Sequence, residues 1–278
     1  MQLGGRLIPF TKAHARGNDF LIVTEEAARD YDWASLTKRL CARKTGIGAD
    51  GVEFFAWAGP NSGRIRLHNA DGSIAELSGN GTRCVAAWMA RELNAQCGDE
   101  LQIETDAGIR LCRIDQIRSG GRFEVEVTTG MGVPEFEPKK LTVLDEQIVE
   151  GLIVFTGNPH FVVMVPDADF KLAHWSWNSV GAEICTHPDF PKQTNVEFFH
   201  VASPNEIEIR IWERGVGPTL SSGTGTSASA TAAIALGLVK SPLTVVAPGG
   251  AQTVAWSGPG SELFLTGPAT LIARGEAW

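Results

Sequence analysis

No stretch of the 278-residue chain approaches the roughly 18 uninterrupted apolar residues that a membrane-spanning helix needs. The first residues, MQLGGRLIPF, also lack the apolar core of a secretory signal peptide. The five cysteines show no C-x-x-C spacing, so a zinc site or redox motif of that type is not expected. We therefore expect a reduced, cytoplasmic protein whose cysteines are mostly packed as small apolar side chains.

Clusters of basic residues are absent as well. The chain has 24 Lys and Arg residues against 32 Asp and Glu residues, which gives a formal net charge of −8. This balance argues against a nucleic-acid partner and mainly favours solubility. The hydrophobic fraction of 43% and charged fraction of 20% are typical of a globular chain with a sizeable core, built as one large domain or two ordinary ones.

What the sequence does contain is an internal repeat. Four pairs of short stretches recur in one order at an offset of 140 to 144 residues: GNDF (17–20) and GNPH (157–160), DGVEFF (50–55) and TNVEFF (194–199), SGNGT (78–82) and SGTGT (222–226), DAG (106–108) and PGG (248–250). One such match could arise by chance, but four in the same order indicate two homologous lobes of ordinary domain size.

The apolar pattern agrees with two similar lobes. It predicts helices over 33–43, 80–94 and 223–239, of which the last two are rich in alanine and suited to burial against a sheet. EIEIRIWE (206–213) alternates apolar and polar residues, as a half-exposed strand does. The pattern predicts strands over 20–24, 52–57, 64–69, 101–105, 109–114, 122–129, 160–165, 195–202, 206–213, 243–247 and 263–267. We predict an α+β fold of two pseudo-symmetric lobes, each a mostly antiparallel sheet or barrel wrapped on a central helix.

Each lobe carries a glycine-rich loop that leads into an alanine-rich helix, with Ser78 and Ser222 at the N-cap positions. A helix N-terminus offers unpaired N–H groups and a partial positive charge, which suit a carboxylate. We expect both loops to face one cleft between the lobes and to hold one carboxylate from both sides. The two serines would then reach opposite faces of the attached carbon, as inversion of a stereocentre needs. Taken singly, each loop can also be read as a tight turn.

Nine motifs extend over almost the whole chain: HARGNDF (14–20), RKTGIGADG (43–51), HNADGSIAELSGNGTRC (68–84), TGNPH (156–160), TNVEF (194–198), WERGVG (212–217), SSGTG (221–225), APGG (247–250) and LFLTGPAT (263–270). These motifs have the order and spacing of those in the diaminopimelate epimerases, so the chain resembles this family of isomerases of lysine and cell-wall precursor synthesis. The resemblance implies a small amino-acid substrate, LL-diaminopimelate by default, no pyridoxal phosphate, no other cofactor, no metal, and commonly a homodimer. The stretch MGVPEFEPKK (131–140) breaks the strand pattern, so we place the boundary there, between an N-terminal lobe of residues 1–130 and a C-terminal lobe of residues 131–267. The resemblance also implies that residues 268–278 complete the N-terminal lobe.

The resemblance further implies roles for individual residues. Four asparagines would hold the polar ends of the substrate: Asn18, Asn69, Asn158 and Asn195. Four residues would bind the reacting carboxylate through their N–H groups: Gly79, Asn80, Gly223 and Thr224. Arg214 would grip the distal carboxylate with its bidentate fork, and His160 and Glu213 would be acid–base or orienting groups. Without the resemblance, the asparagine of GNDF could supply a turn, His160 could be structural, and Glu213 with Arg214 could form a surface pair.

The reacting pair departs from the family pattern. The family has a cysteine immediately before each glycine-rich tract, where this chain has Ser78 and Ser222. Because an alcohol is a far weaker acid than a thiol, whose pKa is about 8.5, proton transfer by two serines should be slower by several orders of magnitude unless other bases take part. The family also usually has glutamate where Pro218 follows the GVG tract.

Three explanations of the serines remain open. The chain can be a natural relative that uses other acid–base groups and acts on diaminopimelate or another small amino or carboxylic acid. Its candidate groups are Glu213, His160, Asp50, Glu76 and Asp71. Alternatively, it is a double Cys→Ser variant of an ordinary epimerase, or a protein that binds an amino acid without turnover.

Overall fold

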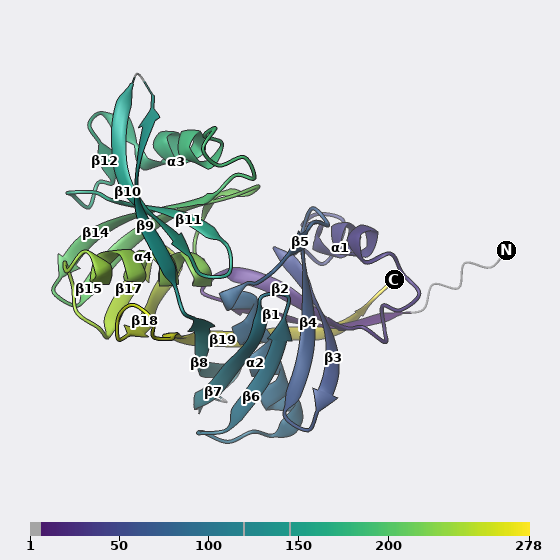
Figure 1. The fold of residues 1–278 in the computed structure, drawn as a ribbon. Helices are drawn as coiled ribbons and strands as arrows, with labels where there is room; N and C mark the ends of the chain where they lie inside the picture. Colours follow the sequence, from purple (N-terminus) through teal and green to yellow (C-terminus); the bar gives the residue numbers. More distant parts are fainter. Residues whose placement is uncertain (1–6, 119, 145) are drawn as a thin grey trace. The chain divides into compact units, whose positions relative to one another are not determined.

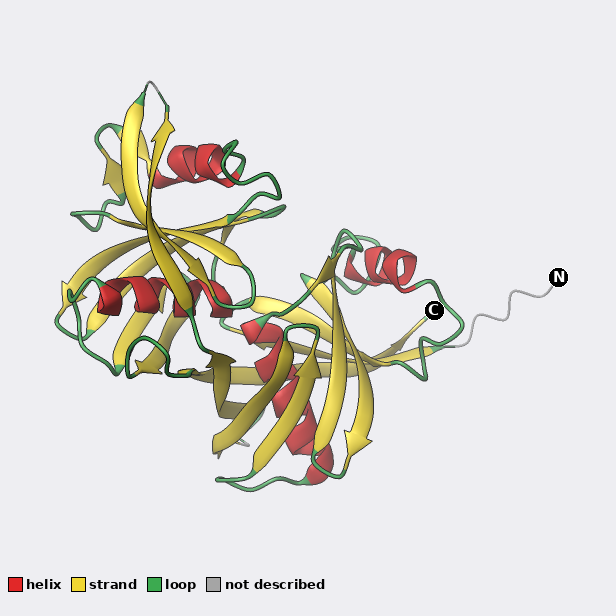
Figure 2. Ribbon diagram, viewed as in Figure 1, coloured by secondary structure: helices red, strands yellow, loops and turns green. Residues whose placement is uncertain are grey.

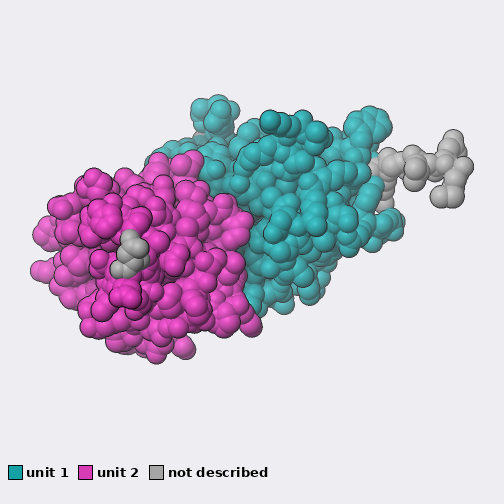
Figure 3. All heavy atoms as spheres, turned by 90° about the horizontal axis from the view of Figure 1, so that it is seen from above, with its two compact units in different colours: residues 1–129, 267–278 teal, residues 130–266 magenta. Residues whose placement is uncertain are grey.

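The computed structural model describes residues 7–118, 120–144 and 146–278, and the chain divides into two compact units (Figure 3). Unit 1 comprises residues 1–129 and 267–278, and unit 2 comprises residues 130–266. The chain passes between the units within two long strands, β8 (Phe123–Gly132) and β19 (Leu263–Ala277). Within the described ranges, no helix is long and apolar enough to cross a membrane.

Eight strands of unit 1 close into a barrel (Figure 1). Their order around the barrel is β1 (Ile8–Ala15), β2 (Asn18–Thr24), β3 (Gly51–Gly59), β4 (Ser62–Asn69), β6 (Glu100–Thr105), β7 (Gly108–Arg118), β8 and β19, which pairs with β1. The pairs β2–β3 and β4–β6 are parallel, whereas β1–β2, β3–β4, β6–β7, β7–β8 and β1–β19 are antiparallel. A short strand, β5 (Ile74–Ala75), pairs with β4.

Helix α2 (Gly79–Leu93) runs through the interior of this barrel (Figure 2). Its residues from Gly79 to Ala90 are all buried, and besides small and apolar side chains they include the fully buried Arg83. The helix ends at Asn94, whose left-handed backbone (φ 51°) closes the last turn. Helix α1 (Trp33–Cys41) covers the outside of the sheet, where Leu36 and Leu40 pack with side chains of β2 and β3.

Unit 2 repeats this plan. Its antiparallel hairpin of β9 (Glu135–Val143) and β10 (Gln147–Phe155) is followed by β11 (Pro159–Met164), β14 (Asn195–Ser203), β15 (Glu206–Glu213), β17 (Leu243–Ala247), β18 (Gly250–Trp256) and the first part of β19. The parallel pairs are β11–β14 and β15–β17, at the places that β2–β3 and β4–β6 have in unit 1. Three short strands complete the unit: β12 (Lys171–Leu172), β13 (Trp175–Ser176) and β16 (Gly217–Thr219).

The helices of unit 2 also follow the pattern of unit 1. Helix α4 (Gly223–Ala235) is buried from Gly223 to Ala233 and contacts the strands β10, β11, β14 and β15. Helix α3 (Trp177–Cys185) packs on the other face of β14 through Val180 and Ile184. The α+β fold with a central helix in each half, predicted from the repeat, is thereby confirmed.

Several element boundaries differ from the prediction. The helix predicted over 223–239 ends at Ala235, because the backbone turns at Gly237 with a positive φ of 70°. Helix α3 was not predicted, since nine residues give too short a periodic pattern. The strands β1, β9, β10 and β18 were also missed, as were the short strands β5, β12, β13 and β16. The stretch MGVPEFEPKK, interpreted as a break in the pattern, contains the start of β9.

Candidate active site

The glycine-rich loop of unit 1 ends in a serine-capped helix. Ser78 has an extended backbone, and its Oγ accepts a hydrogen bond from the N–H of Gly81 at 3.0 Å. Its carbonyl oxygen accepts from Thr82 N at 2.8 Å, which begins the helical ladder. The serine thus stabilises the N-terminus of α2, and its hydroxyl keeps a hydrogen and a second lone pair for another partner.

The loop of unit 2 is built in the same way. Ser222 caps α4, and its Oγ accepts from the N–H of Gly225 at 3.2 Å. The side chain is nearly buried, and its Oγ also lies 3.4 Å from Oγ1 of Thr224. Gly223 and Thr224 begin the first turn of α4, and Gly79 and Asn80 begin that of α2. The N–H groups of a first turn have no acceptor within the helix. We call each serine-capped N-terminus a half-site.

A fully buried glutamate lies beneath each capped N-terminus. Glu53 of β3 and Glu197 of β14 have no exposed surface. A Cβ atom at Gly81 would lie 2.0 Å from Oε1 of Glu53, and one at Gly225 would lie 2.5 Å from Oε1 of Glu197. Glycine at these positions therefore leaves room for the two carboxyl groups. Sequence reasoning missed both glutamates, although the repeated VEFF stretch contains them.

In unit 2 the glutamate has a histidine partner. Nδ1 of His160 lies 2.8 Å from Oε1 of Glu197, and its Nε2 lies 2.9 Å from Oδ1 of Asn158. Because an amide oxygen can only accept a hydrogen bond, Nε2 of His160 carries a hydrogen and donates it to Asn158. The hydrogen bond between Nδ1 and the carboxyl group of Glu197 then contains a second proton, which the two groups share. His160 is fully buried, so it orients Asn158 from behind instead of facing the solvent.

In unit 1 phenylalanine takes the place of this histidine. In the parallel pair β2–β3, Phe20 lies opposite Gly51, and Glu53 follows Gly51 by two residues on β3. In the parallel pair β11–β14, His160 lies opposite Asn195, and Glu197 follows Asn195 by two residues on β14. Phe20 and His160 therefore hold equivalent positions relative to the two glutamates. Neither carboxyl oxygen of Glu53 has a hydrogen-bond partner among the described residues. Burial alone raises the pKa of Glu53 to about 8, so the carboxyl group holds a proton at neutral pH.

This buried acid should make stability depend on pH. A raised pKa in the folded state stabilises the fold most below about pH 4.5, the ordinary value, and the contribution falls as the pH rises towards 8. We expect Glu53→Gln to remove this slope, which amounts to up to ~5 kcal/mol at 1.36 kcal/mol per pKa unit. Urea unfolding of the wild type and of Glu53→Gln at pH 5 and pH 8.5 measures the free energy of unfolding at each pH. If this free energy changed equally with pH in the two proteins, the raised pKa would not belong to Glu53.

Hydrogen bonds in unit 1 fix the amide group of Asn18. Its Nδ2 donates to Oδ2 of Asp50 at 2.7 Å, and its Oδ1 accepts from Nδ2 of Asn80 at 3.2 Å. Arg43 donates to the other oxygen of Asp50 at 2.6 Å and to Asp19 at 3.0 Å. Asp50, a candidate acid–base group, is thus bound as the anion that orients Asn18.

Asn69 lies at the end of β4, where Nδ2 donates to Oγ of Ser73 at 3.0 Å. Hydrogen bonds from the side chain and backbone of Ser73 lower the pKa of Asp71, so this carboxyl group is committed to the turn. Glu76, another candidate acid–base group, is exposed. Unit 1 therefore brings Asn18 and Asn80 into direct contact, while Asn69 belongs to the adjacent turn.

In unit 2, Asn195 receives the backbone N–H of Arg214 on its Oδ1 at 2.9 Å. The guanidinium of Arg214 is exposed and donates to the carbonyl oxygen of Lys192 at 3.1 Å. Glu213, the last residue of β15, lies opposite Gly217 of β16 and is half-buried. Arg214 is thus held by its backbone with its charged group at the surface.

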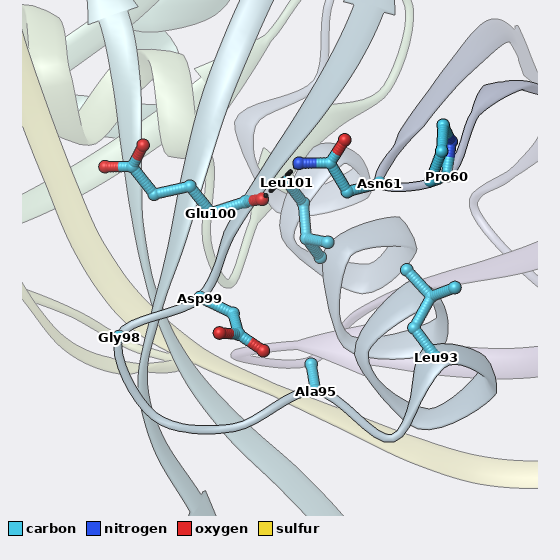
Figure 4. A pocket seen from close by; sticks show the side chains of 8 residues that line it. All are labelled: Pro60, Asn61, Leu93, Ala95, Gly98, Asp99, Glu100 and Leu101. Atoms are coloured by element: carbon cyan, nitrogen blue, oxygen red, sulfur yellow. Dashed lines mark hydrogen bonds between the residues drawn. The ribbon is translucent and has the colours of Figure 1, made fainter.

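A hollow in unit 1 lies away from these residues (Figure 4). It is lined by Pro60, Asn61, Leu93, Ala95, Gly98, Asp99, Glu100 and Leu101. Leu93 is the last residue of α2, so the hollow lies about 20 Å along the helix from Ser78 at 1.5 Å per residue. No predicted site residue lines it. Within the described parts of the chain, no three His, Cys, Asp or Glu side chains are grouped to hold a metal ion.

Comparison with known proteins gives a consistent picture. The family model of diaminopimelate epimerase matches residues 10–136 and 152–272. The chain is 37% identical over 286 residues to the diaminopimelate epimerase of Halothermothrix orenii, covering 97% of each chain. Two solved structures share the fold. A predicted epimerase of Pseudomonas aeruginosa has a TM-score of 0.73 and 14% identity, and the match covers 97% of this chain and 99% of that one. A hydroxyproline epimerase of Agrobacterium vitis has a TM-score of 0.73 and 15% identity, and the match covers 99% of this chain and 93% of that one.

Proposed function

The chain belongs to the diaminopimelate epimerase family, and we propose that it is a cofactor-independent isomerase that inverts the α-carbon of an amino acid. The observation that carries this proposal is the repeated half-site, a serine-capped helix N-terminus above a buried glutamate, present once in each unit. Each N-terminus suits a carboxylate, and each serine hydroxyl can exchange a proton.

We propose that both half-sites act on one substrate carbon. One serine removes the α-proton while the other delivers a proton to the opposite face, and the electron pair of the broken C–H bond passes into an enolate of the substrate carboxylate. The N–H groups of Gly79, Asn80, Gly223 and Thr224 would stabilise the negative charge of that enolate. The duplication supports this assignment, because inversion needs one proton-exchanging group for each face.

The proposed binding residues are Asn18, Asn69, Asn158, Asn195 and Arg214. The hydrogen bonds that fix Asn18 and Asn158 support a binding role, because an oriented amide loses little freedom when a ligand arrives. Arg214 leaves its guanidinium at the surface, where its fork can receive a distal carboxylate. For Glu213 we propose an acid–base or orienting role beside the reacting carbon.

The proposed substrate is LL-diaminopimelate, converted to the meso form in lysine and cell-wall precursor synthesis, because the relatives carry that name. A second candidate is another small amino or carboxylic acid, since a hydroxyproline epimerase shares the fold. We also propose a cytoplasmic homodimer. All five cysteines are unpaired, as expected in a reducing compartment, and the resemblance to the family supports a dimer. Sedimentation at monomer mass would argue against the dimer.

Solvent exchange at the α-carbon tests the proposed function. We expect LL-diaminopimelate to incorporate deuterium from heavy water in the presence of the protein, slowly because both proton-exchanging groups are alcohols. Proline and trans-4-hydroxy-L-proline are the matched probes for the second candidate. If the protein gains thermal stability from an amino acid without any exchange, it is a binding protein and the isomerase proposal is wrong.

A further inference from the structure

The proposed function leaves unit 1 with a chemical difficulty. The hydroxyl of Ser78 is too weak an acid to carry a proton to or from an α-carbon by itself near neutral pH. Proton transfer at this position therefore needs a second group behind the serine. The cap hydrogen bond from Gly81 occupies only one lone pair of Oγ, so the hydroxyl can still exchange its hydrogen.

Glu53 lies where such a group is needed. On β3, Val52 and Phe54 belong to the core beneath α1, whereas Phe55 belongs to the core around α2. Alternation along the strand turns Glu53 towards α2 as well. Its Oε1 lies 2.0 Å from the place of a Cβ atom at Gly81, and Cβ of Ser78 lies 3.2 Å from the same point. Oε1 of Glu53 and Cβ of Ser78 are therefore at most about 5 Å apart. One side-chain rotation or one bridging water can connect the carboxyl group and the hydroxyl over this separation.

A contribution to stability does not explain why a glutamate occupies position 53. A carboxyl group in an apolar barrel core costs stability, and its oxygens receive no hydrogen bond from the described residues. In unit 2 the matching glutamate is bound to His160, which shares its proton and orients Asn158. Phe20 excludes that arrangement from unit 1, so Glu53 must hold its proton alone.

We propose that Glu53 exchanges a proton with Ser78 and thereby makes the unit 1 half-site competent for proton transfer. The inference rests on the proposed isomerase function and deepens it. Glu53 acts through Ser78 and does not touch the substrate.

The step balances in both directions. When unit 1 removes the α-proton, the Cα–H bond breaks, its electron pair enters the enolate, Oγ of Ser78 takes the proton, and the former hydroxyl hydrogen passes to ionised Glu53. When unit 1 returns a proton, protonated Glu53 gives its hydrogen to Ser78, whose own hydrogen forms the new Cα–H bond.

The surroundings keep the carboxyl group protonated in the resting protein. Apolar side chains face it from β2 and β4, namely those of Phe20, Ile22 and Leu67. From α2 the titratable neighbour is Cys84, and burial raises the pKa of that thiol, so it stays neutral. With burial as the one cause that raises the pKa of Glu53 to about 8, the resting half-site is a proton donor at pH 7.

The test compares wild type with Glu53→Gln, which keeps the shape of the side chain but cannot exchange a proton. We expect kcat for α-proton exchange of LL-diaminopimelate to fall at least ~100-fold while KM changes little, as for loss of a general acid. Glu104→Gln, an exposed glutamate of the same barrel, should leave kcat unchanged. The carboxylic-acid infrared band of the folded protein should disappear in Glu53→Gln and, in wild type, above about pH 8.

Phe20→His keeps Glu53 and supplies the imidazole found in unit 2, so it tests the inference even if Glu53→Gln fails to fold. We expect the infrared band and the matching limb of the pH profile to move to lower pH. Exchange by wild type with an unchanged kcat in Glu53→Gln, or an unmoved pH profile in Phe20→His, overturns this inference and leaves the proposed function standing. No exchange by wild type overturns both.

Discussion

The combined substitution Ser78→Cys and Ser222→Cys is expected to raise α-proton exchange by at least ~100-fold, because a thiol at a helix N-terminus forms its anion near neutral pH and an alcohol does not. Both side chains cap a helix with Oγ beside the first turn, so a sulfur atom at the same position would feel the same N–H groups. Deuterium incorporation into LL-diaminopimelate, followed by mass spectrometry, measures the change.

Ser221→Cys is the matched control, since Ser221 is equally buried but precedes the cap by one residue. It should not raise the exchange rate. Each cap replacement should cost about 0.5–2 kcal/mol of stability, because sulfur is a poor acceptor for the N–H groups of Gly81 and Gly225. If the double variant folds and exchanges no faster than wild type, the missing thiols are not what limits the reaction, and a reshaped site, for example around Pro218, becomes the explanation.

Gly81→Ala and Gly225→Ala are each expected to destabilise their unit by about 1–3 kcal/mol, through a forced shift of a buried carboxyl group. The new methyl group would lie 2.0 Å from Glu53 Oε1 in the first variant and 2.5 Å from Glu197 Oε1 in the second. Helix propensity alone would favour alanine by up to ~1 kcal/mol, so the sign of the effect distinguishes the two causes. Chemical unfolding of each variant measures it.

Gly120→Ala is the control, because nothing lies within 4 Å of a Cβ atom there and the backbone needs no positive φ. Its effect on stability should be close to zero. Adding Glu53→Ala to Gly81→Ala should restore much of the lost stability, since the second change removes the atom that the methyl group meets. A double variant no more stable than Gly81→Ala would show that the carboxyl group is not the obstacle.

The repeat predicted more of the fold than any single segment did. Matching stretches at one offset predicted two similar halves, and alanine-rich tracts predicted the two central helices, because alanine favours a helix and suits burial against a sheet. Elements that escaped include α3, which is short, and β9, which contains several charged residues. Their stability comes from packing against the rest of their unit, which a local pattern does not record.

The sequence by itself determined the family, the two glycine-rich helix starts and the serines at both caps. Only the tertiary structure decided what lies behind each cap. Glu53 and Glu197 share the local sequence VEFF, and His160 and Phe20 are 140 residues apart in the chain. Parallel strand pairing puts His160 beside one glutamate and Phe20 beside the other, so two similar motifs acquire different proton chemistry. Proton chemistry depends on burial and on hydrogen-bond partners, and both are properties of the folded chain.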